Sequence, residues 1–203
     1  YWWAVQTFLT KCASSYNTFR QEYPITPEQA FVTTGSRFFV QLYPNAQPSE
    51  GYKQYQQPTP YRIYSLGADT ASGSALGDYS AFCVLDVTDK VRPEIVSTFY
   101  DRVSPSVFAK KVLEEVKKYN ALAVVESNSY GLSILEHLTK SEWGFLYRRT
   151  KYDKLENRWT EQLGFNTSSS TRALMLSRLQ EYLTNGWLDP KDPNLQYEMN
   201  SFI

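Results

Sequence analysis

Residues 63–87 hold the feature that most constrains the fold, because two apolar runs bracket a loop of small residues. The first run ends at Asp69, the loop reads TASGSALGD, and the second run begins at Tyr79. Asp is disfavoured inside strands, so a carboxylate at the end of a buried strand indicates a ligand-holding role. The alternative is that Asp69 caps a turn, as Asp often does. The stretch predicts a strand, a loop and a second strand, with Asp69 as the first candidate site residue.

The pattern after residue 61 predicts an α/β fold with a mixed sheet and helices on both faces. The expected strands cover residues 62–68, 79–88, 94–100, 121–125 and 145–149. Short connections favour an antiparallel meander for the first three. A helix opens at Ser104 and Pro105, with a buried stripe of Phe108, Val112, Val116 and Tyr119. Further helices are expected over residues 132–139 and 171–184, and the right-handed crossover rule sets strand 121–125 parallel to the first strand.

The first 60 residues differ in composition from the rest. Apolar residues at helical spacing predict a helix over residues 1–21, and Thr26 is a candidate N-cap for the segment PEQAF. Residues 43–60 are rich in Pro, Gln and Tyr, which predicts a linker or an extended segment and a domain boundary. The sequence starts at Tyr1 without a Met, so we expect a fragment of a longer polypeptide.

Composition narrows the classes of function. The formal net charge is zero, so contact with an anionic polymer must come from local patches. The two cysteines, Cys12 and Cys83, lie far apart, which argues against a disulfide framework or a zinc cluster and favours a reduced, intracellular protein. The apolar run at the start is too short and too interrupted to span a membrane, and it lacks the basic region of a signal peptide.

A second acid, Glu126, follows the expected strand 121–125. Two parallel strands then each end in an acid, and neighbouring strands lie about 4.8 Å apart. Open α/β sheets bind ligands at the carboxyl ends of their strands. Pairs of Mg²⁺ or Mn²⁺ ions held by carboxylate oxygens are a recurrent device for phosphodiester cleavage. The sequence therefore predicts a site for divalent metal at Asp69 and Glu126, with Asp78 as a possible further ligand.

Each acid also has a structural interpretation. Glu126 could pair with a Lys or cap the next helix, and Asp78 could be a turn residue. Asp86 and Asp89 are expected to be surface acids at the far end of the hairpin, and His137 is expected to be structural. A single His and the lack of a Cys cluster fit oxygen-ligated metals and argue against zinc.

Basic residues concentrate near the end of the chain, where seven stand against three acidic ones between Tyr147 and Arg178. The seven are Arg148, Arg149, Lys151, Lys154, Arg158, Arg172 and Arg178. They interleave with Tyr147, Tyr152 and Trp159, a pattern that fits a phosphate backbone. The candidate DNA contacts are Arg148, Arg149, Lys151 and Arg172. The alternative is a solvated loop over residues 150–170 followed by a helix face, with Ser170 and Thr171 as a helix start.

Three segments resemble the large terminase subunit of tailed bacteriophages: GADTASGSALGDYSAFCVLDV, VVESNSYG and FRQEYPITPEQAFVTTGSRFF. The similarity runs from about Phe19 to the end. It implies an RNase H-like nuclease domain over residues 61–203, preceded over residues 1–60 by the C-terminal edge of an ATPase domain and its linker. The implied activity is metal-dependent endonuclease cleavage of concatemeric double-stranded DNA by a two-metal mechanism, with Mg²⁺ or Mn²⁺, during virus assembly in the host cytoplasm. The implied partners are the ATPase domain of the same chain, the small terminase subunit and the portal.

By this resemblance, Asp69 matches the first metal-binding aspartate of the family and Glu126 matches the second acid. Asp78 matches an acid of the GDYSA turn, and Arg172 stands where many members have Lys. The phosphate-binding loop of the family's motor is absent, so we do not expect ATP hydrolysis.

The family's third catalytic aspartate follows the element that resembles QYEMNSF, so we expect the third ligand beyond Ile203. Asp189 and Asp192 precede that element in a Pro-flanked turn and are not proposed as its substitute. Two other functions stay open. One is a DNA-binding or portal-docking module with absent or partner-dependent catalysis. The other is half of a sugar-kinase or actin-like ATPase, against which the sequence shows no second phosphate loop.

Overall fold

The computed structural model describes residues 9, 38–39, 43–127, 130–153 and 157–202. The chain divides into two compact units, which we describe separately. The larger unit is Asn45–Tyr197, and the smaller one combines Tyr1–Pro44 with Glu198–Ile203. No helix in the described parts is long and apolar enough to cross a membrane.

Five strands of the larger unit form a mixed sheet in the order β1-β4-β3-β2-β5. They are β1 (Gly51–Gln54), β2 (Tyr64–Asp69), β3 (Ser80–Asp86), β4 (Glu94–Asp101) and β5 (Leu122–Val125). The predicted meander is confirmed, because β2, β3 and β4 pair antiparallel in sequence order. The predicted crossover is confirmed as well, because β5 lies beside β2 and runs parallel to it.

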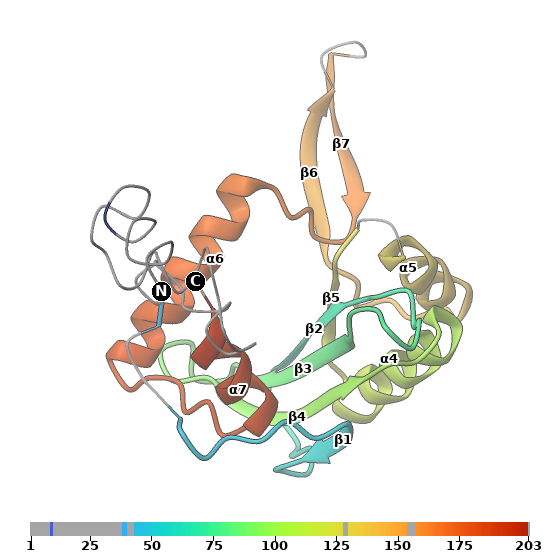
Figure 1. The fold of residues 1–203 in the computed structure, drawn as a ribbon. Helices are drawn as coiled ribbons and strands as arrows, with labels where there is room; N and C mark the ends of the chain where they lie inside the picture. Colours follow the sequence, from blue (N-terminus) through green and yellow to red (C-terminus); the bar gives the residue numbers. More distant parts are fainter. Residues whose placement is uncertain (1–8, 10–37, 40–42, 128–129, 154–156, 203) are drawn as a thin grey trace. The chain divides into compact units, whose positions relative to one another are not determined.

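Four helices flank the sheet: α4 (Pro105–Tyr119), α5 (Gly131–Lys140), α6 (Ser169–Thr184) and α7 (Pro193–Ser201). Within the larger unit, α4 and α5 cover one face of the sheet and α6 lies on the other side (Figure 1). Helix α4 begins after Ser104 with Pro105 in its first turn, and the left-handed conformation of Asn120 ends it at a φ of 49°. Helix α6 ends just before Gly186, whose φ is 64°.

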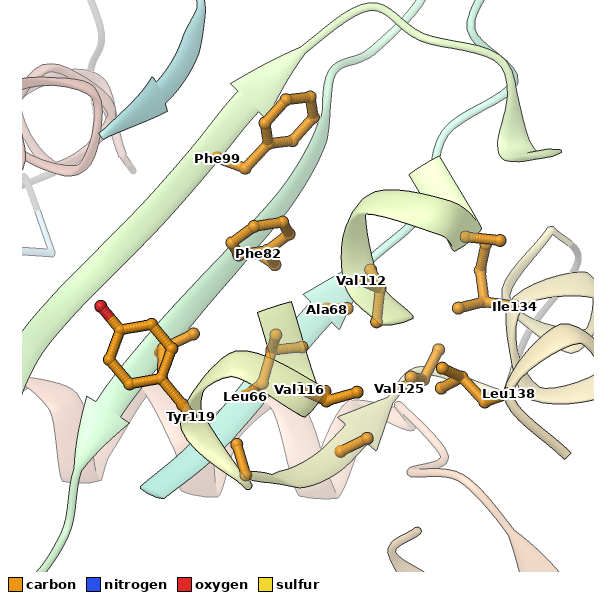
Figure 2. Close-up of a cluster of buried hydrophobic side chains, with 14 of the residues drawn as sticks. Leu66, Ala68, Phe82, Phe99, Val112, Val116, Tyr119, Val125, Ile134 and Leu138 are labelled. Carbon is orange, nitrogen blue, oxygen red and sulfur yellow. The ribbon is translucent and has the colours of Figure 1, made fainter. Parts of the chain in front are cut away.

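The core lies between the sheet and the helices α4 and α5. The four stripe residues predicted for α4, from Phe108 to Tyr119, are all buried. They pack on inward-facing residues of the strands, such as Leu66, Phe82 and Val125, and on Ile134 and Leu138 of α5 (Figure 2). Alternate residues of β2 and β3 point into this core, as the period of a strand requires. The core thereby fixes which residues of β2 and β5 face the opposite side.

The expectation of a loop over residues 150–170 is wrong for most of that range. β6 (Arg148–Asp153) and β7 (Arg158–Leu163) form a separate antiparallel two-stranded sheet, the β6–β7 hairpin. Both strands are rich in charged residues and also contain Thr, Tyr and Trp, and most of these side chains are exposed, as suits a solvated ribbon. The strand expected over residues 145–149 begins as a single parallel bridge from Leu146 to Ala123 and continues into β6.

Two further expectations need correction. The linker expected over residues 43–60 contains β1, which pairs with β4 as the edge strand of the sheet. Asp86 is not a surface acid, because it is buried, accepts a hydrogen bond from the Thr88 amide at 2.9 Å and lies 3.3 Å from Arg62. Asp89 is exposed, as expected, and accepts hydrogen bonds from the next turn.

The smaller unit is described only in part. Phe38, Phe39 and Phe202 form an aromatic cluster, with ring centroids between 5.0 and 5.8 Å apart. The side-chain amide of Asn200 exchanges two hydrogen bonds with the backbone of Tyr43, each at 2.9 Å. The helix predicted over residues 1–21 and the PEQAF segment lie outside the described residues, except for Leu9, which is helical.

Candidate functional site

Asp69 and Glu126 lie side by side at the carboxyl ends of β2 and β5. The parallel register pairs Ala68 with Val125, and the Glu126 amide donates a hydrogen bond to the Ala68 carbonyl oxygen at 3.1 Å. Ala68 and Val125 are buried in the core, so the next residue on each strand faces the opposite side of the sheet. The main chain therefore sets both carboxyl groups on the same face, close enough for Glu126 to act on the pKa of Asp69.

This closeness changes the acidity of Asp69. Burial raises the pKa of Asp69 to about 6, and the hydrogen bond with Glu126 and the negative charge of Glu126 add to the rise. The negative charge of Asp78 raises it further, while a hydrogen bond from the Thr70 backbone opposes the rise. Two carboxylates this close repel each other at neutral pH, and a bound cation relieves that repulsion.

The loop after Asp69 is held against the start of β3. The Ala71 amide donates to Ser80 Oγ at 3.0 Å, and Ser80 is fully buried. Gly73 has a φ of 76°, and a Cβ there would come within 2.4 Å of the Val103 carbonyl oxygen. Thr70 Oγ1 is buried and has no hydrogen-bond partner among the described residues. The residue directly after Asp69 thus carries a buried hydroxyl that is unsatisfied among the described residues.

Asp78 is exposed in the turn before β3, and Arg102 holds that turn from both sides. Arg102 Nε donates to the Gly77 carbonyl oxygen at 2.8 Å, and Arg102 Nη1 donates to the Tyr79 hydroxyl. The guanidinium lies 3.7 Å from the centroid of the Tyr79 ring, which stacks on Tyr100. The residues on either side of Asp78 are therefore fixed by one side chain. No sequence motif indicated this role for Arg102.

Helix α5 packs directly on the backbone of Glu126. A Cβ at Gly131, the first residue of α5, would come within 1.7 Å of the Glu126 carbonyl oxygen. Only glycine allows this approach. Gly131 is the last residue of the segment VVESNSYG, which the sequence analysis singled out. The reason for a glycine at this position, its close approach to Glu126, is visible only in the structure.

The candidate DNA contacts lie on two elements, β6 and α6. Arg148, Arg149 and Lys151 are on β6, and Arg172 is exposed in the first turns of α6. Arg148 lies 3.8 Å from Glu161, and Arg149 Nη2 donates to Gln162 Oε1 at 2.8 Å.

The segment between the hairpin and α6 pairs with the end of β5. Phe165 forms a parallel bridge with Glu126, and the Ser127 amide donates to the Phe165 carbonyl oxygen at 2.7 Å. Three residues later Ser168 caps α6, where it and Thr171 form a reciprocal capping box. The chain that carries the basic residues is thus anchored at the acid pair.

Asp192 is a buried structural acid. Thr98 Oγ1 and Tyr55 OH donate to Asp192 Oδ2 at 2.6 and 2.8 Å. The amides of Asn194 and Leu195 donate to its Oδ1. These donors occupy its oxygens. Asp189 is exposed, and His137 is half-buried on α5.

The donors at Asp69 and Glu126 fit a hard divalent cation. Both supply carboxylate oxygens, which Mg²⁺ and Mn²⁺ prefer. Within the described residues, no group of three or more His, Cys, Asp or Glu side chains gathers as a complete ligand set. A cation here would therefore keep several water ligands.

No protein-family model matches the sequence. Solved structures of phage nucleases resemble the fold, and three of them have 18 to 20% sequence identity to this chain. The large terminase nuclease of the thermophilic phage G20c with bound zinc has a TM-score of 0.56, at 20% identity over 82% of this chain and 84% of the other. The same nuclease with bound magnesium has a TM-score of 0.50, at 18% identity over 80% and 73%. The Thermus phage P74-26 large terminase nuclease domain has a TM-score of 0.51, at 19% identity over 80% and 73%.

These matches confirm the expected resemblance at the level of the fold. The mixed sheet with its flanking helices has the RNase H-like architecture of terminase nuclease domains. The G20c nuclease holds zinc in one of these structures and magnesium in another.

Proposed function

We propose that the chain contains the endonuclease domain of a viral DNA-packaging motor, which cuts concatemeric double-stranded DNA by metal-dependent phosphodiester hydrolysis. The carboxyl pair of Asp69 and Glu126, at adjacent carboxyl ends of parallel strands, carries this proposal. The shared fold with terminase nucleases supports it. We also propose the division made from the sequence: residues 1–60 as the end of an ATPase domain and its linker, and residues 61–203 as the nuclease.

In this proposal Asp69 and Glu126 hold two divalent ions, Mg²⁺ or Mn²⁺. Bound there, the ions would make a water molecule a stronger nucleophile and stabilise the charge on the leaving oxygen. Both carboxyl groups must lose their protons first, which links activity to the raised pKa of Asp69. Asp78 would serve as a possible further ligand, and Thr70 Oγ1 would accept or donate a hydrogen bond to water in the site.

The basic residues bind and orient the DNA backbone. Arg148, Arg149 and Lys151 of β6 and Arg172 of α6 flank the segment that pairs with Glu126. Their phosphate contacts would position a strand over the acid pair without reading its sequence. The proposed partners are the ATPase domain of the same chain, the small terminase subunit and the portal, in the host cytoplasm during assembly.

Cleavage of supercoiled plasmid with Mg²⁺ or Mn²⁺ tests this function. The protein should nick the plasmid only with added metal, and Asp69→Asn should abolish nicking. Asp89→Asn is the matched control, because Asp89 is an exposed acid in the turn between β3 and β4. A version extended past Ile203 belongs in the same experiment, and activity in that form alone would locate a missing ligand there.

A second candidate function rests on the incomplete ligand set among the described residues. It is a DNA-binding or portal-docking module of the same fold, with absent or partner-dependent catalysis. DNA binding by every form, with no cleavage under any metal, would favour this module over the nuclease.

A further inference from the structure

The β6–β7 hairpin exposes a large aromatic surface to solvent. Trp159 is 70% exposed and Tyr152 is 42% exposed, whereas Trp143 and Trp187 are half-buried. The hairpin extends away from the five-stranded sheet and is a sheet of its own (Figure 1). A two-stranded ribbon in water is only marginally stable by itself. An indole left open on such a ribbon indicates a surface that binds something.

The two rings form one unit across the strands. Tyr152 and Trp159 are register partners, so their side chains lie on the same face of the ribbon. Their centroids are 5.3 Å apart with an interplanar angle of 64°, an edge-to-face arrangement. The Tyr152 hydroxyl also donates to Asn157 Oδ1, which restrains its ring. Tyr152 therefore supports the indole at its side and leaves a broad part of it open.

The opposite face of the ribbon is cationic and polar. Lys151 precedes Tyr152 and Arg158 precedes Trp159, so by the alternation of a strand both lie on that other face, and both are exposed. A polymer that wraps around the edge of the ribbon would contact Lys151 and Arg158 on one face and the indole of Trp159 on the other. The protein is neutral as a whole, so this local excess of basic residues favours an anionic partner.

We propose that Trp159, supported by Tyr152, stacks on an unpaired base of DNA while Lys151 and Arg158 contact the adjoining phosphates. Base–aromatic stacking of this kind tolerates any sequence, because every base has a flat face. In a paired duplex those faces are covered by neighbouring bases, so the hairpin distinguishes opened DNA from intact duplex. This inference rests on the proposed function, since it takes DNA as the partner.

Binding of labelled oligonucleotides tests the inference without cleavage. Fluorescence anisotropy, with Ca²⁺ in place of Mg²⁺, compares an intact duplex with the same duplex carrying a central unpaired stretch. The wild type should bind the opened duplex more tightly. Trp159→Ala should weaken binding to the opened duplex about 10-fold and leave binding to the intact duplex nearly unchanged. Trp159→Phe should retain most of the preference, and Trp159→Leu, which is apolar without a flat face, should lose it.

Tyr61→Ala is the matched control, because Tyr61 is a fully exposed aromatic residue outside the hairpin. A 2-aminopurine in the unpaired stretch adds a direct readout, since stacking quenches its fluorescence, and Trp159→Ala should restore the signal. Equal affinity of Trp159→Ala and the wild type for opened DNA, with no change in quenching, would overturn the inference and assign the aromatic face to a protein partner. Failure of the wild type to bind either DNA would overturn the proposed function as well, so the two failures are distinguishable.

Discussion

Ala68 and Val125 are register partners across the parallel pair of β2 and β5, and this backbone pairing sets Asp69 beside Glu126. The position of both carboxyl groups follows from main-chain hydrogen bonds and a buried core, since Ala68 and Val125 point into it. The site therefore depends on the register of two strands, and changes that shift either strand should act on both acids together.

The raised pKa of Asp69 predicts an unusual dependence of stability on pH in the metal-free protein. Burial, and then the hydrogen bond and charge of Glu126, raise that pKa from 3.8 to about 6. Between these values the folded protein binds more protons at this carboxyl than the unfolded chain does. The contribution of Asp69 to the free energy of unfolding should therefore fall as pH rises through this window. Urea denaturation of the wild type and of Asp69→Asn at several pH values, with a chelator to remove metal, measures this contribution.

From about pH 4 to about pH 6 the wild type should lose stability relative to Asp69→Asn, so the free energy of unfolding of the variant minus that of the wild type should increase. Above about pH 6 this difference should stay constant. Metal affinity should follow the opposite course and rise over the same range, because binding requires the deprotonated acids. Asp89→Asn controls for the loss of one charge. A difference between Asp69→Asn and the wild type that is constant across this range would contradict the assignment.

Gly131→Ala should disrupt the site without touching either acid. The added Cβ would come within 1.7 Å of the Glu126 carbonyl oxygen, so the end of β5 or the start of α5 must move. We expect a loss of about 2 kcal/mol in the free energy of unfolding, with a large drop in metal-dependent nicking. Gly144→Ala is the control, because a Cβ there meets nothing within 4 Å. Equal activity of the two variants would show that the close approach does not support Glu126.

Asp192→Ala should destabilise the larger unit through lost hydrogen bonds. The substitution leaves the hydroxyls of Thr98 and Tyr55 and two turn amides without their acceptor. The expected cost is about 3 kcal/mol in the free energy of unfolding, whereas Asp189→Ala, at an exposed position, should cost little. Thermal or urea unfolding of both variants measures it. An Asp192→Ala protein as stable as the wild type, but unable to bind metal, would instead make Asp192 a ligand.

The elements predicted correctly are those whose signals are local. Helix α4 has Pro105 at its first turn and an apolar stripe at helical spacing, and β5 is a short apolar run that is typical of a parallel strand. The position of β5 beside β2 then followed from the handedness of crossovers. The acid pair could be predicted for the same reason, because Asp69 ends β2 and Glu126 directly follows β5.

The elements missed depend on pairing that sequence patterns do not reveal. β1 lies in a stretch rich in Pro and Gln and is held as a strand by its bonds to β4. β6 and β7 are rich in charged and polar residues, and Leu163 is the one aliphatic residue in them, so no apolar alternation indicated a hairpin. The support of Asp78 by Arg102 joins residues more than twenty positions apart, and the burial of Asp86 depends on Arg62.

Calorimetric titration of Mn²⁺ into the wild type, Asp69→Asn and Glu126→Gln tests the central claim most directly. Each variant keeps the size of its side chain and removes the charge. We expect the wild type to bind Mn²⁺ at neutral pH. Asp69→Asn and Glu126→Gln should each lose this binding, while Asp89→Asn should retain it. Wild-type Mn²⁺ affinity in both Asp69→Asn and Glu126→Gln would contradict the claim that these two acids jointly hold the metal.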